Sequence, residues 1–433
     1  MSHRKRTVGS MTHILLGVTG SIAAFKACHL ASDWSKQGHE VRVVMTAAAR
    51  EFVTPLTFSS LTHTPTRTSM FAAGHNPGDV AGTPDRPLAI NHVDDAKWAD
   101  VLVIAPASAD IIAKLACGIA DDQLTSTALA YSAGPKILCP AMNVHMYENA
   151  VTQRNLRICR ELGWTVVEPG SGMLACHDSG KGRMQEPGLI ETAVDDLLRE
   201  NRPDSEMPLR GLHVLVTAGP TQEPLDPVRF LTNHSTGKMG YALAEQARDL
   251  GARVTLVSGP VALQAPHGVD VVAVRTAQEM FEAVQGRFDD SDITVMAAAV
   301  GDFRPQERSS EKIKKNGRDN ITLTLTSNPD ILAWAGERRR EDQVLCGFAM
   351  ETTDLEANAA KKLASKHCTM LVANNLRTPG AGFAADTNVV TVLRPGDTDD
   401  SPVIEHWDKM GKGPLARRIL VELASIRMGA RQN

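Results

Sequence analysis

Three short motifs in the first half of the chain combine a histidine, an amide and a thiol: INHVD (90–94), PAMN (140–143) and LACHDSGKGRM (174–184). His92 offers a base or hydrogen-bonding group near neutral pH. Asn143 offers a neutral amide that can orient a carboxylate, and Cys176, in a Gly-rich loop with Arg183, offers a thiol proton donor. A single histidine is more often a capping or surface residue, and a single cysteine more often fills apolar space in the core. Composition does not decide between these interpretations.

A glycine turn in GVTGSIAAFK (17–26) joins a strand pattern to a helix pattern. Gly20 allows a sharp turn, and Ser21 with the first helical N–H groups can hold a phosphate. A glycine needed only for packing explains the turn equally well. The full GxGxxG is missing, which favours a mononucleotide over NAD. Thr46 and Ser108 follow two further strand patterns at the sheet edge where such folds bind ligands, although each alone is more often a helix cap.

A turn-rich stretch in the second half, TAGPTQEPLDPVRFLTNHSTGKMGYALAE (217–245), leads into an amphipathic helix. Its STGK tetrapeptide at the helix start suggests phosphate binding, but it is not a P-loop because GxxxxGK[ST] is absent. For STGK alone, a turn with a helix cap is the favoured explanation.

Charged clusters follow in AAAVGDFRP (297–305), EKIKKNG (311–317) and AKKLASK (360–366). A solvated face is the usual explanation for such lysine runs. Alternatively, one lysine neutralises a triphosphate while Asp302 helps to hold Mg²⁺. Lys362 and Lys366 share one helix face, where like charges cost a few tenths of a kcal/mol unless an anion lies between them. A ligand there is plausible.

Short apolar runs alternate with helical patterns along the chain, and they predict the strands and helices that position the candidate site residues. The runs are 13–19, 41–47, 99–108 and 135–142, then 213–218, 252–259, 292–300, 344–350 and 369–375. Such runs are typical of parallel strands buried on both faces, so we predict two doubly wound α/β domains. The polar stretch ENRPDSEMPLRG (200–211) is the linker candidate, and the Gly-, Pro- and Asp-rich segment 72–87 is a surface loop or a lid.

Composition narrows the function classes. The 433 residues exceed one typical domain, and a net charge of −4 gives no reason to expect nucleic-acid or membrane binding. Seven scattered cysteines without CxxC pairs fit a reducing cytoplasm better than disulfides or zinc. The basic start of the chain has no apolar core of a signal peptide, and no apolar run reaches membrane-spanning length.

Residues 13–190 resemble the flavin-dependent 4′-phosphopantothenoylcysteine decarboxylases, with GVTGSIAAFK, INHVD, APASAD (105–110), GIADDQLT (118–125), PAMN and the Cys flap in that family's order. The resemblance implies a flavodoxin-like domain with FMN, which takes electrons from the substrate thiol to ease loss of CO₂ and then returns them. It implies that His92 acts near the thiol and flavin, Asn143 grips the carboxylate and Cys176 donates a proton. The implied FMN-binding residues are Gly20, Ser21, Ile22, Thr46 and Ser108.

Residues 209–410 are similar to bacterial phosphopantothenate–cysteine ligase through PTQEPLDPVRFLTNHSTGKMG, AAAVGDFRP, KIKK, NPDIL, GFAMET and KKLASK. The resemblance implies a Rossmann-like domain that uses CTP and Mg²⁺ to form an acyl cytidylate, from which cysteine displaces CMP. Asn233 would hold that intermediate, Arg229 would support its loop and Lys312 would assist the nucleotide chemistry. The implied CTP and substrate residues are Ala298, Asp302, Pro329, Asp330, Ile331, Leu332, Phe348, Lys362 and Lys366, with Asp302 also the metal ligand.

The expected organisation is therefore a disordered leader (1–12), a decarboxylase domain (13–198), a linker (199–210) and a ligase domain (211–433). The C-terminal ligase would act first, on 4′-phosphopantothenate, cysteine and CTP. The resemblance also implies decarboxylase trimers and ligase dimers, combined in a homo-oligomeric dodecamer. No nucleic-acid or membrane partner is expected, and the expected compartment is the cytoplasm.

The chain departs from these families at His177, Gly301, Thr369 and Asn375. His177 could share proton transfer, and Asn375 could alter the substrate site. Two alternatives remain open. A peptidyl-cysteine decarboxylase or flavin prenyltransferase would not need the ligase half, and a non-enzymatic binding subunit would not need His92, Asn143 and Cys176.

Overall fold

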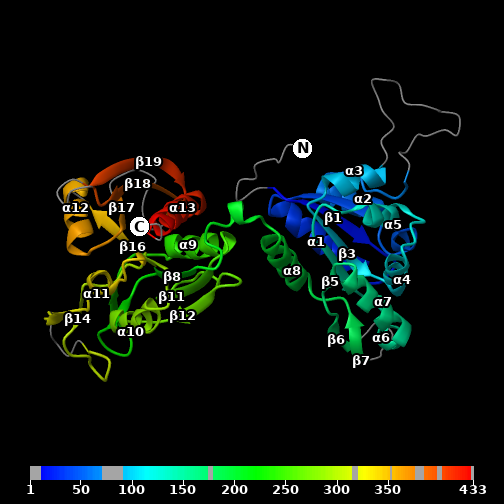
Figure 1. Cartoon of the computed structure of the whole chain (residues 1–433). Coiled ribbons are helices and arrows are strands. Elements are labelled where there is room, and N and C mark those ends of the chain that lie inside the picture. The colour runs from blue at the N-terminus through cyan, green and yellow to red at the C-terminus, as the bar shows by residue number, and fades with distance from the viewer. Residues whose placement is uncertain are drawn as a thin grey trace. The chain divides into compact units, whose positions relative to one another are not determined.

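A computed structural model describes residues 11–70, 91–173, 179–314, 320–351, 354–375, 385–396 and 402–430. The predicted 72–87 loop, Cys176 and His177 lie outside these ranges. The chain forms two compact units, Met1–Arg202 and Pro203–Asn433 (Figure 1). Each unit has its own sheet and its own hydrophobic clusters.

The first unit is built on a sheet whose described strands are all parallel, in the order β2-β1-β3-β4-β5. The strands are β1 (His13–Val18), β2 (Glu40–Met45), β3 (Val101–Ala107), β4 (Lys136–Pro140) and β5 (Trp164–Val166). The hairpin strands β6 (Gly170–Met173) and β7 (Ser179–Arg183) stand apart from this sheet. The helices are α1 (Ala24–Lys36), α2 (Pro55–Thr62), α3 (Asn91–Trp98), α4 (Ala109–Cys117), α5 (Gln123–Ala130), α6 (Val144–Glu148), α7 (Ala150–Glu161) and α8 (Pro187–Glu200), with a 3₁₀ turn η1 (Ala48–Glu51).

Helices cover both faces of this sheet, which explains its uninterrupted apolar strands. Ile14 and Leu16 of β1 pack with residues of α1, α2 and α8 in one buried cluster. Leu15, which points the other way along the strand, packs with residues of α3, α4, α5 and α7. The strand order is that of flavodoxin-like folds, in which ligands bind where the order reverses between β1 and β3.

The second unit has the strand order β12-β11-β8-β13-β16-β17-β18-β19. The strands are β8 (His213–Ala218), β11 (Arg253–Ser258), β12 (Asp270–Ala273), β13 (Ile293–Met296), β16 (Val344–Glu351), β17 (Met370–Asn375), β18 (Thr387–Arg394) and β19 (Val403–Gly411). Short pairs are β9 (Gln222–Pro224) with β10 (Phe230–Thr232), and β14 (Phe303–Pro305) with β15 (Leu325–Ser327). The helices are η2 (Asp204–Glu206), α9 (Lys238–Asp249), α10 (Ala277–Phe288), α11 (Ile331–Arg338), α12 (Leu355–Ser365) and α13 (Lys412–Ala430).

In chain order, the strands from β12 to β17 repeat the 3-2-1-4-5-6 arrangement of a dinucleotide-binding fold and are parallel. The strands β18 and β19 extend this sheet in antiparallel fashion. One cluster beside the sheet includes residues of α9 and α13, and another includes residues of α10, α11 and α12. The prediction of two doubly wound α/β domains, flavodoxin-like and Rossmann-like, is confirmed.

Several elements differ from the sequence expectations. The strands β5, β12, β18 and β19 and the three short hairpins were not predicted. Strands β5 and β12 and the hairpins are short, and β19 carries exposed polar residues. The linker candidate is partly built into the units on either side. Helix α8 continues to Glu200, and Leu209 is fully buried in the cluster of the second unit.

Candidate active sites

The strand order of the first sheet reverses between β1 and β3, and Thr19 joins the loops that follow these two strands. The Thr19 hydroxyl donates to Pro106 O (2.7 Å) and accepts from Ser108 N (2.9 Å). These bonds hold together the loops that follow the two strands. Ser108 itself caps α4, accepting from Ile111 N. The strand ends that carry the predicted flavin residues therefore meet at the edge where this fold binds ligands.

Position 20 requires a glycine because a side chain there would clash with a neighbouring loop, not because the backbone has a positive φ. A Cβ at this position would lie 2.5 Å from the Cβ of Ala48, in the turn after β2. Close packing of two loops, the alternative explanation for this glycine, therefore accounts for the absence of a side chain at this position. Ser21 Oγ accepts from Ala23 N (3.3 Å), and Thr46 Oγ1 accepts from Ala49 N (3.3 Å). Ile22 is largely exposed beside them.

His92 stands in the first turn of α3 with one ring nitrogen lacking a partner. Its Nδ1 atom is buried and has no hydrogen bond among the described residues. Buried polar atoms are nearly always paired, so an unpaired one needs an explanation. A bound substrate or cofactor group that supplies the missing partner is such an explanation.

Asn143 caps α6 and lies beside the glycine-rich hairpin. Its Oδ1 accepts from His145 N (2.8 Å), and Met142 N donates to Gly182 O (2.9 Å). Gly182 has a φ of +150°, and a Cβ there would lie 2.3 Å from Met142 O. A Cβ on Gly180 would lie 2.6 Å from a Val144 methyl. The GxG of the flap therefore lets its strand β7 lie directly on the PAMN segment.

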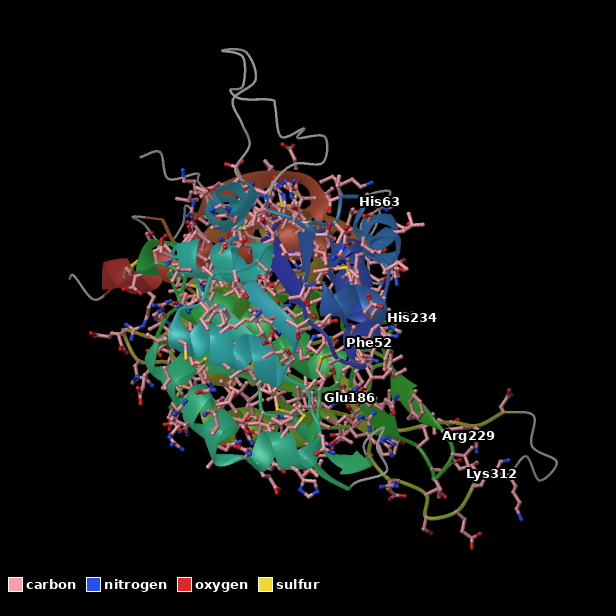
Figure 2. The ribbon with its side chains drawn as sticks, turned by 90° about the vertical axis from the view of Figure 1, so that its right-hand side faces the viewer. Phe52, His63, Glu186, Arg229, His234 and Lys312 are labelled. Atoms are coloured by element: carbon pink, nitrogen blue, oxygen red, sulfur yellow. The ribbon has the colours of Figure 1, made fainter. Side chains whose placement is uncertain are left out.

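A buried lysine ties the end of this hairpin to α1. Lys26 Nζ donates to Met184 O (3.2 Å) and to Glu186 Oε1 (3.0 Å), which also pairs with Arg183 (3.0 Å). Hydrogen bonding from Lys26 and the two positive charges lower the pKa of the Glu186 carboxyl. Figure 2 labels Glu186.

Replacing Lys26 by Met is expected to lower the free energy of unfolding by at most about 1 kcal/mol at pH 7, because Glu186 is solvated. A depressed carboxyl pKa adds stability above the ordinary value of 4.5, and this stability is lost as the pH falls through the folded value. The difference in free energy of unfolding between the variant and the wild type, measured by urea titration, should therefore become smaller toward pH 4. Lys36→Met, on the exposed end of the same helix, is the control. A difference that does not change with pH would contradict the assignment.

Four described cysteines, Cys139, Cys159, Cys346 and Cys368, are buried and therefore poorly suited to proton donation. Cys139 and Cys346 are fully buried, and burial raises the pKa of Cys159 to about 11 and that of Cys368 to about 12. They fill apolar space in the sheets and helices. Cys176, the residue predicted to be reactive, lies outside the described residues.

In the second unit the reversal point lies between β8 and β13. Asn233 Nδ2 donates to Ala299 O (2.9 Å), which follows β13. Thr217 Oγ1 accepts from Ala298 N (3.2 Å), and Thr221 Oγ1 accepts from Gly301 N (2.9 Å). The predicted residues Asn233 and Ala298 are thereby brought to the same edge of the sheet. Gly301, a departure from the family pattern, has room for a Cβ, since its nearest contact would be 3.5 Å away.

A buried carboxylate joins the Arg229 loop to the Lys312 segment. Asp226 accepts from Val228 N and Arg229 N (both 2.8 Å), from the Arg229 guanidinium and from Ile313 N (3.0 Å). Arg229 Nη2 also donates to Ile313 O (2.6 Å). The Arg229 hydrogen bond, helped by these N–H groups, holds the pKa of Asp226 far below its usual range. Figure 2 labels Arg229 and the exposed Lys312 on these neighbouring segments.

The predicted nucleotide residues on α11 and α12 are linked to each other. Lys366 Nζ donates to Asp330 Oδ2 (2.6 Å), and Asp330 Oδ1 caps α11 by accepting from Ala333 N. Burial opposes ionisation of Asp330, but Lys366, that N–H and Lys362 bring its pKa below the usual value. The anion expected near the two lysines is thus supplied at least partly by the protein. Asp302 is exposed, and its carbonyl accepts from Asn328 N (2.8 Å).

A pocket of about 120 Å³ lies at the start of α9 and along the ends of β13 and β16. It contains the predicted Ala298 and Phe348, and also Lys238, Lys412 and Asn374. Burial, and then the nearby Lys238, lower the pKa of Lys412. The buried Oδ1 of Asn374 has no hydrogen-bond partner among the described residues. Asn374 and Lys412 were not predicted as site residues; Asn374 ends an apolar strand run, a usable signal, whereas nothing in the polar sequence around Lys412 marks it.

No metal centre is preformed in the described part of the chain, where no three His, Cys, Asp or Glu side chains gather closely enough to hold an ion. Asp302, the predicted metal ligand, would contribute one carboxylate to an ion site. Among the helices that the structure describes, none is long and apolar enough to cross a membrane.

Comparison with known proteins gives matches along nearly the whole chain. Residues 2–199 match the Flavoprotein family, and residues 209–426 match the DNA/pantothenate metabolism flavoprotein C-terminal domain. The chain is 45% identical over 416 residues to the Coenzyme A biosynthesis bifunctional protein CoaBC of Bacillus subtilis, covering 96% of this chain and 97% of the relative. A crystal structure of the C-terminal domain of CoaBC is 40% identical and covers 52% of this chain and all of that one, with a TM-score of 0.43. A PPC decarboxylase mutant complexed with pantothenoylaminoethenethiol is 34% identical and covers 42% of this chain and 96% of that one, with a TM-score of 0.37.

Proposed function

Because the chain belongs to the family of bifunctional coenzyme A biosynthesis proteins, we propose that its C-terminal unit joins 4′-phosphopantothenate to cysteine with CTP. The N-terminal unit then decarboxylates the product to 4′-phosphopantetheine. The chain thus carries a ligase and a flavin-dependent decarboxylase. One observation supports both halves: each sheet reverses its strand order at an edge where residues proposed for that half lie, Ser108 in the first unit and Asn233 and Ala298 in the second.

The first unit is a flavoprotein domain, and the flavin proposed for it is FMN. Its loops fit such a group, because Ser108 and the turn at Gly20 meet at the sheet edge and the unpaired His92 Nδ1 lies buried in the same unit. When bound, FMN supplies an electron sink that makes loss of CO₂ feasible. Gly20, Ser21, Ile22, Thr46 and Ser108 would hold it.

The side chains of this unit are proposed to handle the substrate and its protons. His92 moves a proton at the substrate thiol, through a ring nitrogen that needs a partner. Asn143 orients the substrate carboxylate by hydrogen bonding, and Cys176 supplies the final proton. The packing of β7 on the PAMN segment would place the flap beside Asn143.

In the second unit the substrate carboxylate must be activated, because an amine cannot expel hydroxide at neutral pH. The carboxylate attacks the α-phosphorus of CTP and pyrophosphate leaves; the cysteine amine then attacks the acyl carbon and CMP leaves. Asn233 holds the acyl cytidylate, Arg229 supports that loop and Lys312 offsets the negative charge that develops. Asp302 would hold Mg²⁺ together with the triphosphate, since Mg²⁺ commonly binds through one carboxylate and substrate phosphates.

The remaining CTP residues are proposed to be Ala298, Pro329, Asp330, Ile331, Leu332, Phe348, Lys362 and Lys366. The pocket adds Asn374, whose unpaired oxygen can accept an N–H of the nucleotide or substrate, and Lys412 beside the start of α9. Since Lys366 is already bonded to Asp330, it would act on a phosphate only by sharing that bond.

Activation of the carboxylate can be tested without the second half-reaction. Protein incubated with phosphopantothenate, CTP and Mg²⁺ but no cysteine should release pyrophosphate, and added hydroxylamine should trap the acyl group as a hydroxamate. Release of pyrophosphate without hydroxamate, or with no need for phosphopantothenate, would argue against an acyl cytidylate. ATP in place of CTP tests the nucleotide preference.

We further propose a cytoplasmic homo-oligomer, with trimeric decarboxylase units and dimeric ligase units combined in a dodecamer. The prediction rests on family resemblance. Light scattering of the flavin-loaded protein tests it, because a trimer or dimer alone would have a fraction of the expected mass.

A further inference from the structure

The motif GIADDQLT (118–125) has no part in the chemistry described so far, yet it forms the start of α5. Asp122 caps this helix by accepting from Thr125 N (2.8 Å), and Thr125 Oγ1 accepts from Asp122 N (3.0 Å), a reciprocal capping box. This cap fixes the position of the next residue, Gln123, at the point where α5 packs on α3.

Gln123 is 3% exposed and reaches across to α3, the helix that carries His92. In one orientation of its amide, Nε2 lies 3.4 Å from both Asp95 Oδ2 and Thr127 Oγ1. With oxygen and nitrogen exchanged, the oxygen accepts from His92 N (3.2 Å) and the nitrogen donates to Ser69 O (3.3 Å). Both orientations tie α3 to α5. The first does so through Asp95, whereas the second gives up that bond and pairs the amide with His92 N and Ser69 O.

The contact with His92 N has a physical reason. The first N–H groups of a helix have no carbonyl acceptor within the helix. His92 is the second residue of α3 as the structure describes it (Asn91–Trp98), so within the described part of the chain an acceptor for its N–H must come from outside the helix. An oxygen supplied by Gln123 from a neighbouring helix fulfils this need at the residue whose ring is proposed to act on the substrate.

The rest of α3 is held independently. Asp95 has no exposed surface and is paired with Arg42 (3.0 Å) and Arg67 (3.5 Å). Arg67 also donates to Asn91 Oδ1 (3.0 Å). These contacts fix the helix as a body, whereas Gln123, in the second orientation of its amide, reaches the main chain of His92 itself.

We propose that Gln123 is a positioning residue for His92 in the decarboxylation, an inference that rests on the proposed function of the first unit. It fixes the main chain of His92 and thereby the direction of the imidazole, whose Nδ1 has no partner among the described residues. A displacement of about 1 Å at a reacting group can cost about 100-fold in rate. Gln123 therefore affects turnover more than substrate binding.

The test compares Gln123→Met with Thr127→Val in the full-length, flavin-loaded protein. The Met variant keeps the size of the side chain and removes both amide groups. The Val variant removes only the hydroxyl on α5 that Gln123 also contacts. With phosphopantothenoylcysteine as substrate, we expect Gln123→Met to lower kcat about tenfold or more and to shift the pH–rate profile. KM, the flavin spectrum and the ligase rate should not change, and Thr127→Val should resemble wild type.

A double-mutant cycle separates positioning from general packing. In a His92→Asn background, Gln123→Met should have no further effect on the residual rate, because the residue it positions is gone. The inference would be overturned if the two substitutions lowered kcat independently, so that their effects multiplied in the double variant. It would also be overturned if Gln123→Met kept the wild-type kcat and pH profile, or if Thr127→Val lowered kcat equally. If the Met variant does not retain flavin, Gln123→Asn, which keeps the amide but shortens its reach, is measured instead with the same outcomes. A wild-type protein without decarboxylase activity would instead refute the proposed function.

Discussion

Replacing Asp226 by Asn is expected to lower the ligase rate by about 100-fold or more while leaving decarboxylation unchanged. The Asp226 carboxylate accepts hydrogen bonds from the Arg229 guanidinium and from three main-chain N–H groups. An amide would turn an NH₂ group toward some of these donors and remove the charge that faces Arg229. Both the Arg229 loop, which leads to Asn233, and the segment carrying Lys312 would lose their common anchor.

The measurement is CMP release with phosphopantothenate, cysteine and CTP, beside CO₂ release from supplied phosphopantothenoylcysteine. Asp204→Asn is the control, because Asp204 also pairs with an arginine, Arg210, but its side chain is 84% exposed. A ligase rate in Asp226→Asn within twofold of the control would show that this anchor is not needed. Loss of both activities together would show that the two units do not function separately.

Replacing His92 by Asn is expected to lower decarboxylation by about 100- to 10,000-fold, the usual contribution of a positioned acid or base. Asn keeps a polar group at the start of α3 but cannot exchange a proton near neutral pH. The flavin spectrum should remain, since none of the proposed flavin-holding residues is changed. Ligation should also remain at the wild-type rate.

His63→Asn provides the matched control for this substitution. His63 ends α2 in a left-handed conformation (φ 55°), which asparagine tolerates, and it is exposed (labelled in Figure 2). Its decarboxylation rate should equal that of wild type. A His92→Asn protein that binds flavin and still decarboxylates at more than a tenth of the wild-type rate would contradict the role assigned to His92.

The parallel strands could be predicted from the sequence because burial on both faces leaves an uninterrupted apolar signal. The runs at 13–19 and 213–218 became β1 and β8. The edge strands β5, β12 and β19 could not be predicted, because β5 and β12 are short and the apolar signal of β19 is interrupted by exposed polar residues. In β19, for example, only Trp407 is fully buried.

Less of the candidate sites than of the fold could be predicted from the sequence. The turn residues after each strand could be placed at one sheet edge, since parallel strands share that edge. The anchor between Asp226 and Ile313, however, joins positions 87 residues apart. Likewise, nothing in KKLASK shows that Lys366 is bonded to Asp330, because that contact depends on how α11 and α12 pack.

The central claim is that one chain carries two consecutive reactions in the reverse of their order along the sequence. Its most direct test supplies the flavin-loaded protein with phosphopantothenate, cysteine, CTP and Mg²⁺ and follows products over time. The account predicts CMP and CO₂ in equal final amounts, phosphopantothenoylcysteine as a transient species and 4′-phosphopantetheine as the end product. Formation of neither CMP nor 4′-phosphopantetheine by folded, flavin-loaded protein would contradict it.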